Sequence, residues 1–362
     1  MTDDAMHPPI KVGFVLLSPS RAPIPSTRIA VLNMFPLLRE AGFAPHIVFE
    51  PEQGSQTPNV DGLLPELVAQ RYDVIVFQKV HGASVEALAH GLREAGIKTV
   101  FALCDVVDVP MAQATDMTVI VTDYLKSLYP AALQHKIRVV HDGIEHPEVI
   151  KQDWGSHRGS AAAPLRAVLV TSAEMLRLPV LPALPPWLEV TIVGRYAASP
   201  LARLRSARWT YQQLPRHQRL PLLRFLFNRR IRCVPWHPER VYDAMREADI
   251  GIIPIERMPV HAPGTPAPDW KVKSENRLTM KMAIGLPVIA TPIPSYEPAV
   301  QQGVNAYLAE TPADWLACLK SLRDPAARAA MGQAARESAL RRYSMQEQAR
   351  LLSTALKELV GK

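Results

Sequence analysis

A cluster of cationic and polar side chains stands at the predicted start of a helix in the C-terminal half. Ser274 or Glu275 is expected to begin this helix, which continues to Ile284. A helix N-terminus attracts anions because it presents unpaired backbone N–H groups and the positive end of the helix dipole. The cluster therefore predicts a phosphate-binding site, the alternative being a capped surface helix flanked by chance lysines, and its members are Lys271, Lys273, Ser274, Asn276 and Arg277.

Polar side chains also follow two predicted strands in the N-terminal half. His81 comes shortly after the strand at 74–77, and Asp105 directly follows the strand at 99–103. The loops at the carboxyl ends of parallel strands form ligand sites. An imidazole or a carboxylate in such a loop can act as a general base or bind substrate oxygens. We therefore predict Asp105 and His81 as catalytic residues, the alternative for His81 being an incidental loop histidine.

A proline-rich loop at 18–28 follows the first predicted strand and ends in Ser26, Thr27 and Arg28. Ser26 or Thr27 is expected to cap a helix that Pro36 kinks and Gly42 ends. A hydroxyl, a helix start and an arginine together can bind an anion. These three residues are a candidate anion site, and an ordinary helix cap beside an exposed arginine is the alternative.

Arginine is concentrated in one stretch of the chain. No acidic residue lies between Glu189 and Glu239, and the ten arginines of this stretch contribute a charge of +10. Because the formal charge of the whole chain is +7, the remaining residues sum to −3. Guanidinium groups suit bidentate phosphate binding. Anionic lipid head groups and nucleic acid are both candidate partners, and we expect the lipid surface, through the segment from Arg203 to Arg232, rather than nucleic acid. The alternative is a solvated helix face over a core; the arginines are Arg195, Arg203, Arg205, Arg208, Arg216, Arg219, Arg224, Arg229, Arg230 and Arg232.

Composition excludes several protein classes. The chain has 362 residues, 48% hydrophobic and 21% charged, which is typical of a globular protein with two domains. Three cysteines are too few and too scattered for a disulfide framework or a four-ligand zinc site. A signal peptide and a spanning apolar run are both absent from the sequence. We expect a cytoplasmic protein that is soluble or lies peripherally on the inner face of a membrane.

Strand and helix patterns alternate twice along the chain. Short apolar runs at 12–17, 45–49, 74–77, 99–103, 118–121 and 137–140 predict one parallel sheet, and runs at 167–171, 190–193, 231–234, 250–254 and 287–290 predict a second. Helices between them favour two doubly wound α/β domains. We place the first domain at 1–145 and the second at 146–345, after a Gly/Ser/Pro-rich linker. A terminal helix at 346–362 can pack back on the first domain.

The C-terminal half resembles the group 1 glycosyltransferases. Residues 250–255, Ile-Gly-Ile-Ile-Pro-Ile, are similar to a strand motif of that family. Residues 273–291, which include Met-Ala-Ile-Gly-Leu-Pro-Val-Ile-Ala-Thr, resemble its donor-site segment. Other segments also resemble motifs of this family: residues 294–297 with 303–305, residues 341–344 at the start of the final helix, and residues 140–144 at the entry to the second domain. The resemblance covers residues 135–360 well and the N-terminal half only by its order of elements.

This resemblance implies a GT-B fold, in which two Rossmann-like domains face a cleft. It implies transfer of a sugar from a nucleotide-activated donor to an unknown acceptor, with retention, without a bound metal and with no cofactor beyond the donor. The donor diphosphate would meet the cationic helix start described above, together with Glu297 and Arg195. Ser26, Thr27 and Arg28 would lie on the acceptor side.

The sequence departs from the family pattern at the donor site. Val272 and Met280 stand where the family has a pair of glutamates, and neither side chain accepts a hydrogen bond as a carboxylate does. The donor-phosphate Arg and Lys after the first strand of the second domain are replaced by residues 171–175, Thr-Ser-Ala-Glu-Met. Arg195 either substitutes for them or belongs only to the arginine stretch. Two further functions therefore stay open, a nucleotide-sugar epimerase of the same fold and a catalytically weak sugar- or phosphate-binding module.

Overall fold

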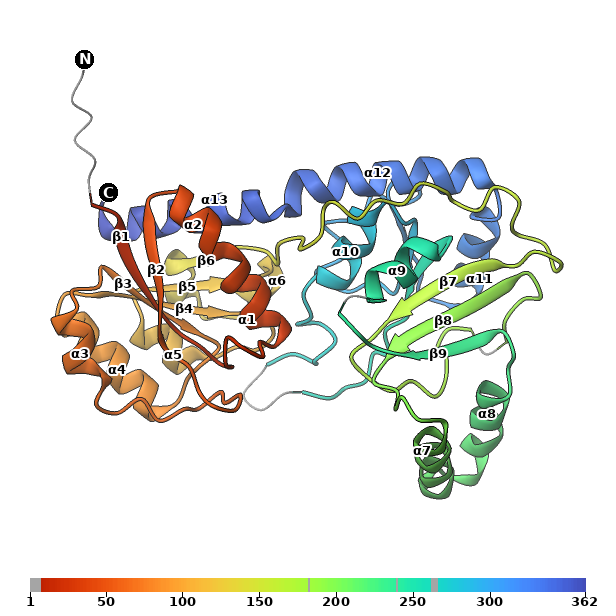
Figure 1. Cartoon of the computed structure of the whole chain (residues 1–362), viewed down its shortest axis with the longest axis horizontal. Helices are drawn as coiled ribbons and strands as arrows, with labels where there is room; N and C mark the ends of the chain where they lie inside the picture. Colours follow the sequence, from red (N-terminus) through yellow and green to blue (C-terminus); the bar gives the residue numbers. More distant parts are fainter. Residues whose placement is uncertain (1–7, 182, 239, 262–265) are drawn as a thin grey trace, which may run out of the picture. The chain divides into compact units, whose positions relative to one another are not determined.

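In the computed structural model, twelve short strands of the described residues form two parallel sheets (Figure 1). The structure describes residues 8–181, 183–238, 240–261 and 266–362. The chain divides into two compact units. Unit 1 comprises Met1–Glu145, Met258–Ser274 and Tyr343–Lys362, and unit 2 comprises His146–Arg257 and Glu275–Arg342.

Unit 1 is built on a six-stranded parallel sheet in the order β2-β1-β3-β4-β5-β6. Val12 of β1 lies opposite Val74 of β3, and the sheet continues outward on both sides of this pair. A parallel sheet needs helices on both faces, so its strands are apolar almost throughout. The strands are β1 (Ile10–Val15), β2 (Phe43–Phe49), β3 (Val74–Gln78), β4 (Lys98–Leu103), β5 (Met117–Ile120) and β6 (Ile137–Val139).

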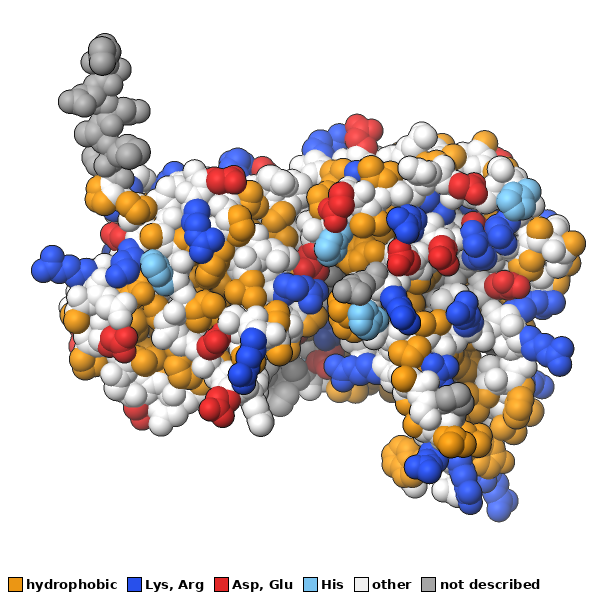
Figure 2. All heavy atoms as spheres, viewed as in Figure 1, with side chains coloured by type: hydrophobic (Ala, Val, Ile, Leu, Met, Phe, Trp, Pro, Cys, Tyr) orange, Lys and Arg blue, Asp and Glu red, His pale blue; other side chains and the backbone are white. Residues whose placement is uncertain are grey.

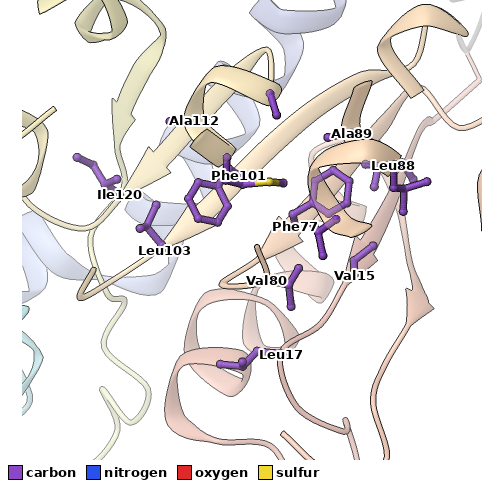
Figure 3. Packing of buried hydrophobic residues seen from close by; sticks show 14 of the residues in the cluster. Val15, Leu17, Phe77, Val80, Leu88, Ala89, Phe101, Leu103, Ala112 and Ile120 are labelled. Atoms are coloured by element: carbon purple, nitrogen blue, oxygen red, sulfur yellow. The ribbon is translucent and has the colours of Figure 1, made fainter. Parts of the chain in front are cut away.

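Helices cover both faces of this sheet. Alternate residues of β3 point to opposite sides, because side chains alternate along a strand. Ile75 and Phe77 pack toward α3, α4, α5 and α6, and part of this cluster is drawn in Figure 3. Val74 and Val76 pack toward α1, η1, α2 and α13. The helices are α1 (Pro25–Ala30), η1 (Leu32–Met34), α2 (Phe35–Glu40), α3 (Leu63–Ala69), α4 (Ala83–Glu94), α5 (Val109–Ala114), α6 (Asp123–Ser127), η2 (Ala131–Lys136) and α13 (Met345–Val360).

Unit 2 repeats the plan with the strand order β12-β11-β10-β7-β8-β9. Leu165, Ala167 and Leu169 of β7 face α8, α11 and α12, whereas Val168 and Val170 face α9 and α10. The strands are β7 (Leu165–Val170), β8 (Leu188–Gly194), β9 (Ile231–Pro235), β10 (Ile250–Ile253), β11 (Val288–Ala290) and β12 (Tyr307–Leu308). The helices are α7 (Pro200–Gln213), α8 (Arg216–Leu226), α9 (Arg240–Glu247), α10 (Asn276–Ile284), α11 (Pro312–Ser321) and α12 (Pro325–Tyr343).

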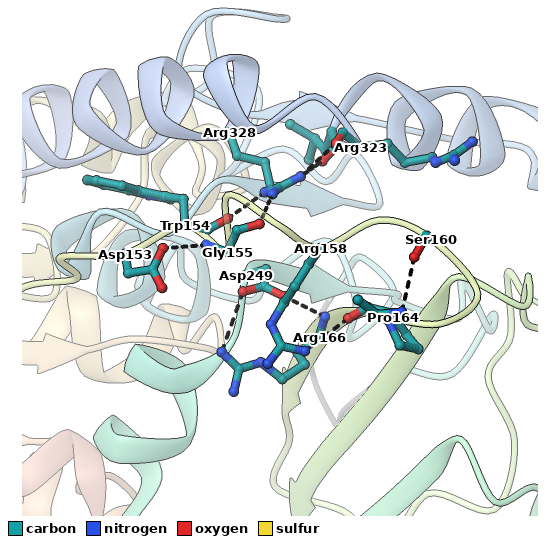
Figure 4. Close-up of polar contacts among 12 residues, drawn as sticks. Asp153, Trp154, Gly155, Arg158, Ser160, Pro164, Arg166, Asp249, Arg323 and Arg328 are labelled. Atoms are coloured by element: carbon teal, nitrogen blue, oxygen red, sulfur yellow. Dashed lines mark hydrogen bonds and ion pairs between the residues drawn. The ribbon is translucent and has the colours of Figure 1, made fainter.

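The segment expected as a linker is anchored in unit 2 by buried polar groups (Figure 4). The guanidinium of Arg328 is fully buried and donates hydrogen bonds to the carbonyls of Trp154, Gly155, Leu322 and Arg323. Buried Asp249 accepts a hydrogen bond from the Arg166 backbone N–H and lies within ion-pair distance of the Arg158 and Arg166 side chains. Because each group has partners, the linker is part of the unit 2 fold.

The expected fold class is confirmed, and some local expectations are wrong. The helix expected over 26–38 is broken into α1, η1 and α2, because Pro36 occupies the first turn of a new helix instead of kinking an old one. Ser26 and Thr27 lie inside α1, whose N-cap is Ile24, so neither caps it. Residues 294–299, where a short helix from Glu297 was expected, form turns. α5, α7 and α8 were not anticipated.

Candidate functional site

The loops that follow the strands of unit 2 converge on one edge of its sheet, because all the strands are parallel. The loop after β7 and the first turn of α10 meet there. Nη2 of Arg277 lies 3.1 Å from Oγ of Ser172 and donates a hydrogen bond to it. The cationic helix start predicted from the sequence is thus held against the carboxyl end of β7.

α10 is fixed rigidly behind this edge. Glu275 is its N-cap, and Gly285 ends it with φ of +89°, a left-handed conformation that glycine adopts without strain. Lys281 is fully buried, and its Nζ donates to the Arg277 carbonyl at 3.1 Å. Burial, together with the nearby Arg277 charge, lowers the pKa of Lys281 to about 7.

Arg195 emerges next to the same loop. It follows Gly194 at the end of β8, and its backbone N–H donates to the Ala173 carbonyl at 3.2 Å. Gly194 permits this close approach, since a Cβ there would lie 2.5 Å from the Ala173 oxygen. The exposed Arg195 side chain therefore starts beside residues 171–175, where the family pattern lacks its usual cations.

Other arginines at this edge are already paired. Arg177 lies 2.6 Å from Glu256, and Arg257 contacts Glu310 and the Pro292 carbonyl. By contrast, neither Arg195 nor Arg277 forms an ion pair with an acidic side chain in the part of the chain that the structure describes.

The other residues predicted for the donor site are divided between the two units, although all of them were expected in the second domain. Lys271, Lys273 and Ser274 belong to unit 1, whereas Asn276, Arg277 and Glu297 belong to unit 2. Lys273 is exposed, and Nζ of Lys271 lies 5.3 Å from the Trp270 ring centroid. Glu297 is exposed in a turn, beside fully buried Tyr296. The described contacts bring together only Arg277 and its neighbours on unit 2.

The two positions that depart from the glutamate pair have apolar surroundings. Val272 is buried in the core of unit 1 with residues of the α3–α5 face of its sheet. Met280 packs against the unit 2 cluster that contains Val168 and Met245. Since both side chains have packing roles, neither position supplies a group that accepts hydrogen bonds from a ribose.

A partly buried ion pair lies at the carboxyl edge of the unit 1 sheet. Nζ of Lys79 lies 2.6 Å from Oδ1 of Asp105, and the lysine side chain is 8% exposed. Burial opposes the charge on Lys79, but the neighbouring Cys104 and Asp105 raise its pKa above the usual value. Lys79 has φ of +57°, an uncommon conformation for a residue other than glycine, and such strained positions cluster at functional sites.

A cavity of about 50 Å³ lies beside this pair, at the ends of β3, β4, β5 and β6. Its polar lining includes Ser26, Gln78, Lys79, Cys104 and Asp142, and the rest is mainly apolar. Burial raises the pKa of the Cys104 thiol, so this cysteine stays protonated near neutral pH. The cavity is large enough for a water molecule or a small substrate group.

His81 and Asp108 form a second pair at the same edge of unit 1. Nδ1 of His81 lies 3.2 Å from Oδ2 of Asp108. The other carboxylate oxygen of Asp108 accepts the Met111 backbone N–H at 2.8 Å and so caps α5. Because the helix cap fixes the carboxylate, the carboxylate in turn orients the imidazole, which is the arrangement of a general base.

The candidate anion site on α1 has partners within the fold. Thr27 is buried, donates to Gln78 and accepts from Ser18. Arg28 makes a bidentate ion pair with Glu145, with N–O distances of 2.7 and 3.0 Å. Ser26 is the member that lines the cavity, and α1 has only six residues. We therefore carry only Ser26 into the site proposed below.

Several site residues were not singled out from the sequence. Asp108, in the loop that follows the strand at 99–103, was given no role, although its place two residues before Pro110 is a helix-start signal. Lys79 and Ser172 carry no local signal, because their partners Asp105 and Arg277 lie far away along the chain.

Among the described residues, no group of three or more His, Cys, Asp and Glu is placed to hold a metal ion. In the same residues no helix has the length and apolarity to span a bilayer.

Family models and solved structures agree with this architecture. A model described as glycosyl transferase-like matches residues 181–354, and one described as glycosyl transferase family 4 group matches residues 26–149. No curated protein matches the chain.

Three similar solved structures cover nearly the whole chain. Anabaena HepE, solved with UDP and glucose, has a TM-score of 0.62 and 14% identity over 96% of this chain and 99% of its own. A glycosyltransferase from Rickettsia africae has a TM-score of 0.69 and 12% identity, covering 98% and 99% of the two chains. Sucrose-phosphate synthase from Thermosynechococcus elongatus has a TM-score of 0.65 and 12% identity, covering 97% and 99%. At these identities the likeness shows the fold.

One family model covers most strands of the unit 1 sheet, the other covers most strands of the unit 2 sheet and extends into α13 of unit 1, and both describe glycosyl transfer. The motifs between residues 250 and 344 resemble those of the same family. The chain therefore belongs to the group 1 glycosyltransferases of the GT-B fold and is an enzyme of that kind.

Proposed function

We propose that this glycosyltransferase moves a sugar from a nucleotide-activated donor to a hydroxyl group of an acceptor. The observation that carries the proposal is the pair of guanidinium groups at the carboxyl edge of unit 2, Arg195 and Arg277, which have no acidic partner among the described residues. A nucleoside diphosphate is the leaving group of this reaction, and it needs cations where its negative charge develops.

The donor site that we propose uses both side chains and backbone. The diphosphate contacts Arg277 and the first-turn N–H groups of α10, while Arg195 approaches from the end of β8. The hydrogen bond from Arg277 to Ser172 holds the guanidinium in place before substrate arrives. HepE, a protein of similar fold, was solved with UDP-glucose, which supports this class of donor.

The proposed donor site extends to residues beside α10. Lys271, Lys273, Ser274 and Asn276 contribute donor contacts around the helix start, and Glu297 binds donor hydroxyl groups. The family resemblance implies that protein cations, without a metal ion, balance the diphosphate charge and that the anomeric configuration is retained. The protein would need no cofactor besides its donor substrate.

The proposed acceptor side lies at the carboxyl edge of unit 1. His81, oriented by Asp108, accepts the proton of the acceptor hydroxyl. The new bond forms between that oxygen and the anomeric carbon on the face from which the diphosphate departs, so that the configuration is retained, and the electron pair of the broken bond leaves with the diphosphate. Asp105, held by Lys79, binds acceptor or sugar hydroxyl groups beside the cavity that Ser26 lines.

A panel of nucleotide sugars tests the proposal. The enzyme is incubated with each donor and an acceptor mixture, and mass spectrometry follows nucleoside diphosphate release and glycosylated product. We expect one class of donor to be consumed with both signals. Conversion to an isomeric nucleotide sugar without diphosphate release would support the epimerase alternative, and binding of donors without any turnover would support the binding module.

A further inference from the structure

Two consecutive helices of unit 2, α7 and α8, form a hairpin that projects beside β9 (Figure 1). We call residues 200–227 the basic hairpin. Its inner side is attached to the unit: Leu222 and Phe225 are buried, and Phe225 packs with the β7–β8 core. Arg203 donates to the Ala197 and Cys233 carbonyls, and Ser206 donates to Glu174 at 2.9 Å. These contacts fix one side of the hairpin and leave the other toward solvent.

The outer side carries large apolar side chains in the open. Among the described residues, the four most exposed large hydrophobic side chains all lie on this hairpin, at 64–80% exposure, and they are Leu201, Leu204, Trp209 and Phe227. Leu220 of α8 is 55% exposed. A solvated helix face has no reason to collect such residues, since burying each of them elsewhere would be favourable.

Arginines alternate with these apolar residues on the same outer side. Arg205 and Arg208 share the exposed face of α7 with Leu204 and Trp209, because the exposed positions of this helix (201, 204, 205, 208 and 209) repeat at intervals of three and four residues. Arg216 and Arg224 share the exposed face of α8 with Leu220. Figure 2 shows the blue and orange side chains intermingled over the hairpin at the lower right.

These arginines lack local neutralisation. No acidic residue occurs between Glu189 and Glu239, and none of the four forms an ion pair with a described acidic side chain. Arg203 and Arg219 differ, because Arg203 bonds backbone carbonyls and Arg219 donates to the Leu214 carbonyl and lies 5.0 Å from the Tyr211 ring centroid. The charge on the outer side is therefore unpaired, and the charge on the inner side is structural.

We infer that the basic hairpin docks the enzyme on an anionic phospholipid membrane. The arginines would bind lipid phosphates, and Leu201, Leu204, Trp209 and Phe227 would enter the boundary between head groups and acyl chains. Nucleic acid would use the arginines but not the exposed leucines, which find no stacking partner there. A second copy of the chain would bring like charges together at the same face. The membrane alone matches both components of the surface.

Vesicle co-sedimentation of the full chain tests this inference independently of glycosyl transfer. The probes are vesicles of phosphatidylcholine alone and of phosphatidylcholine mixed with phosphatidylglycerol, at physiological salt. We expect binding to the mixed vesicles only. Each arginine engaged at an anionic surface contributes about five-fold in affinity, so the variant R205Q/R208Q/R216Q/R224Q should bind at least about 100-fold more weakly.

Two further variants distinguish the contribution of the hairpin charges to vesicle binding from the contribution of its inserted apolar side chains. The matched control R240Q/R246Q/K320Q/R341Q removes four exposed cations elsewhere on unit 2 and should retain nearly full binding. The variant W209S/F227S keeps every charge and should lose about ten-fold or more in affinity, with a Trp209 emission shift seen only in the parent protein. Circular dichroism checks that each variant is folded.

Several results would overturn the inference. One is equal pelleting with neutral and anionic vesicles, and another is equal loss of binding in the matched control, which would make net charge the cause. A third is a gel shift with duplex DNA or RNA under conditions where anionic vesicles do not bind, which would assign the surface to nucleic acid.

Discussion

Nη2 of Arg277 lies 3.1 Å from Oγ of Ser172, and this hydrogen bond joins the first turn of α10 to the loop after β7. The two residues are far apart in the sequence but occupy the same edge of a parallel sheet. Since a hydroxyl partner leaves the guanidinium charge uncompensated, Arg277 is oriented and yet available to an anion. This relationship is the structural basis of the proposed donor site.

Removing the charge at Arg277 should weaken binding of a nucleoside diphosphate. We expect Arg277→Ala, and also Lys273→Ala, to weaken it by about 1.5–3 kcal/mol each, the range for hydrogen bonds to charged groups. Isothermal titration calorimetry with UDP and other nucleoside diphosphates measures the effect. Arg246→Ala on α9 is the matched control, because this exposed arginine pairs only with Asp243 in the described contacts. If Arg277→Ala and Lys273→Ala both bind like the parent enzyme, the assignment of the site is wrong.

The pair formed by His81 and Asp108 should affect turnover more than donor binding. We expect His81→Ala to lower kcat by about 10²–10⁴-fold, the usual contribution of general base catalysis, with little change in donor KM. Asp108→Asn should lower kcat in the same direction, while its amide oxygen still caps α5. Steady-state kinetics with melting temperatures of both variants provide the check. A fall in stability with unchanged kcat in the active fraction would make the pair structural.

Turnover should persist when divalent metal ions are removed. If Arg195, Arg277 and the backbone of α10 balance the diphosphate charge, a metal ion has no required role there. Activity is measured after dialysis against EDTA and again after adding Mg²⁺ or Mn²⁺. Activity that disappears with EDTA and returns with either ion would contradict the proposed charge balance.

Lys281 should make stability depend on pH. Its pKa is lowered by burial and by Arg277 from 10.5 to about 7 in the folded protein, so the unfolded chain binds more protons between these values. The free energy of unfolding should therefore rise with pH above about 7, by at most about 1.4 kcal/mol per pH unit from this group. Lys281→Met should be more stable than the parent at neutral pH, by an amount that shrinks as pH increases.

Urea denaturation from neutral to alkaline pH measures this effect. Lys320→Met, which replaces an exposed lysine on α11, is the control and should follow the parent curve. Identical pH dependence in the parent and Lys281→Met would show that the buried amine is accommodated without a cost to the fold.

The sequence predicted most of the architecture because buried parallel strands are continuous apolar runs. α10 was predicted with its observed end and with a start one or two residues before the observed one, since polar residues precede it and Gly285 ends it. α7 and α8 were not predicted, because arginines and apolar residues share their outer faces and so blur the usual stripe. The unit 1 location of residues 258–274 was also missed, because only tertiary packing shows that Ala267 and Val272 enter that core.

The sequence predicted where residues of the candidate site lie relative to strands and helices, but it did not predict which side chains contact them. Asp105 and His81 were predicted as site residues because they follow strands, and Arg277 because it lies at the start of a helix. Their partners Lys79, Asp108 and Ser172 depend on loops brought together by the sheet, which local patterns do not encode. Thr27 and Arg28 look like ligand-binding residues in the sequence, but the fold supplies Gln78 and Glu145 as their partners.

A crystal structure of the enzyme with UDP or another nucleoside diphosphate that it binds tests the central claim most directly. The account predicts the diphosphate at the carboxyl edge of the unit 2 sheet, within hydrogen-bond distance of Arg277 and the first-turn N–H groups of α10, with Arg195 closing on it from the end of β8. A nucleotide bound elsewhere, for example in the cavity beside Lys79 or on the basic hairpin, with this edge left vacant, would contradict it.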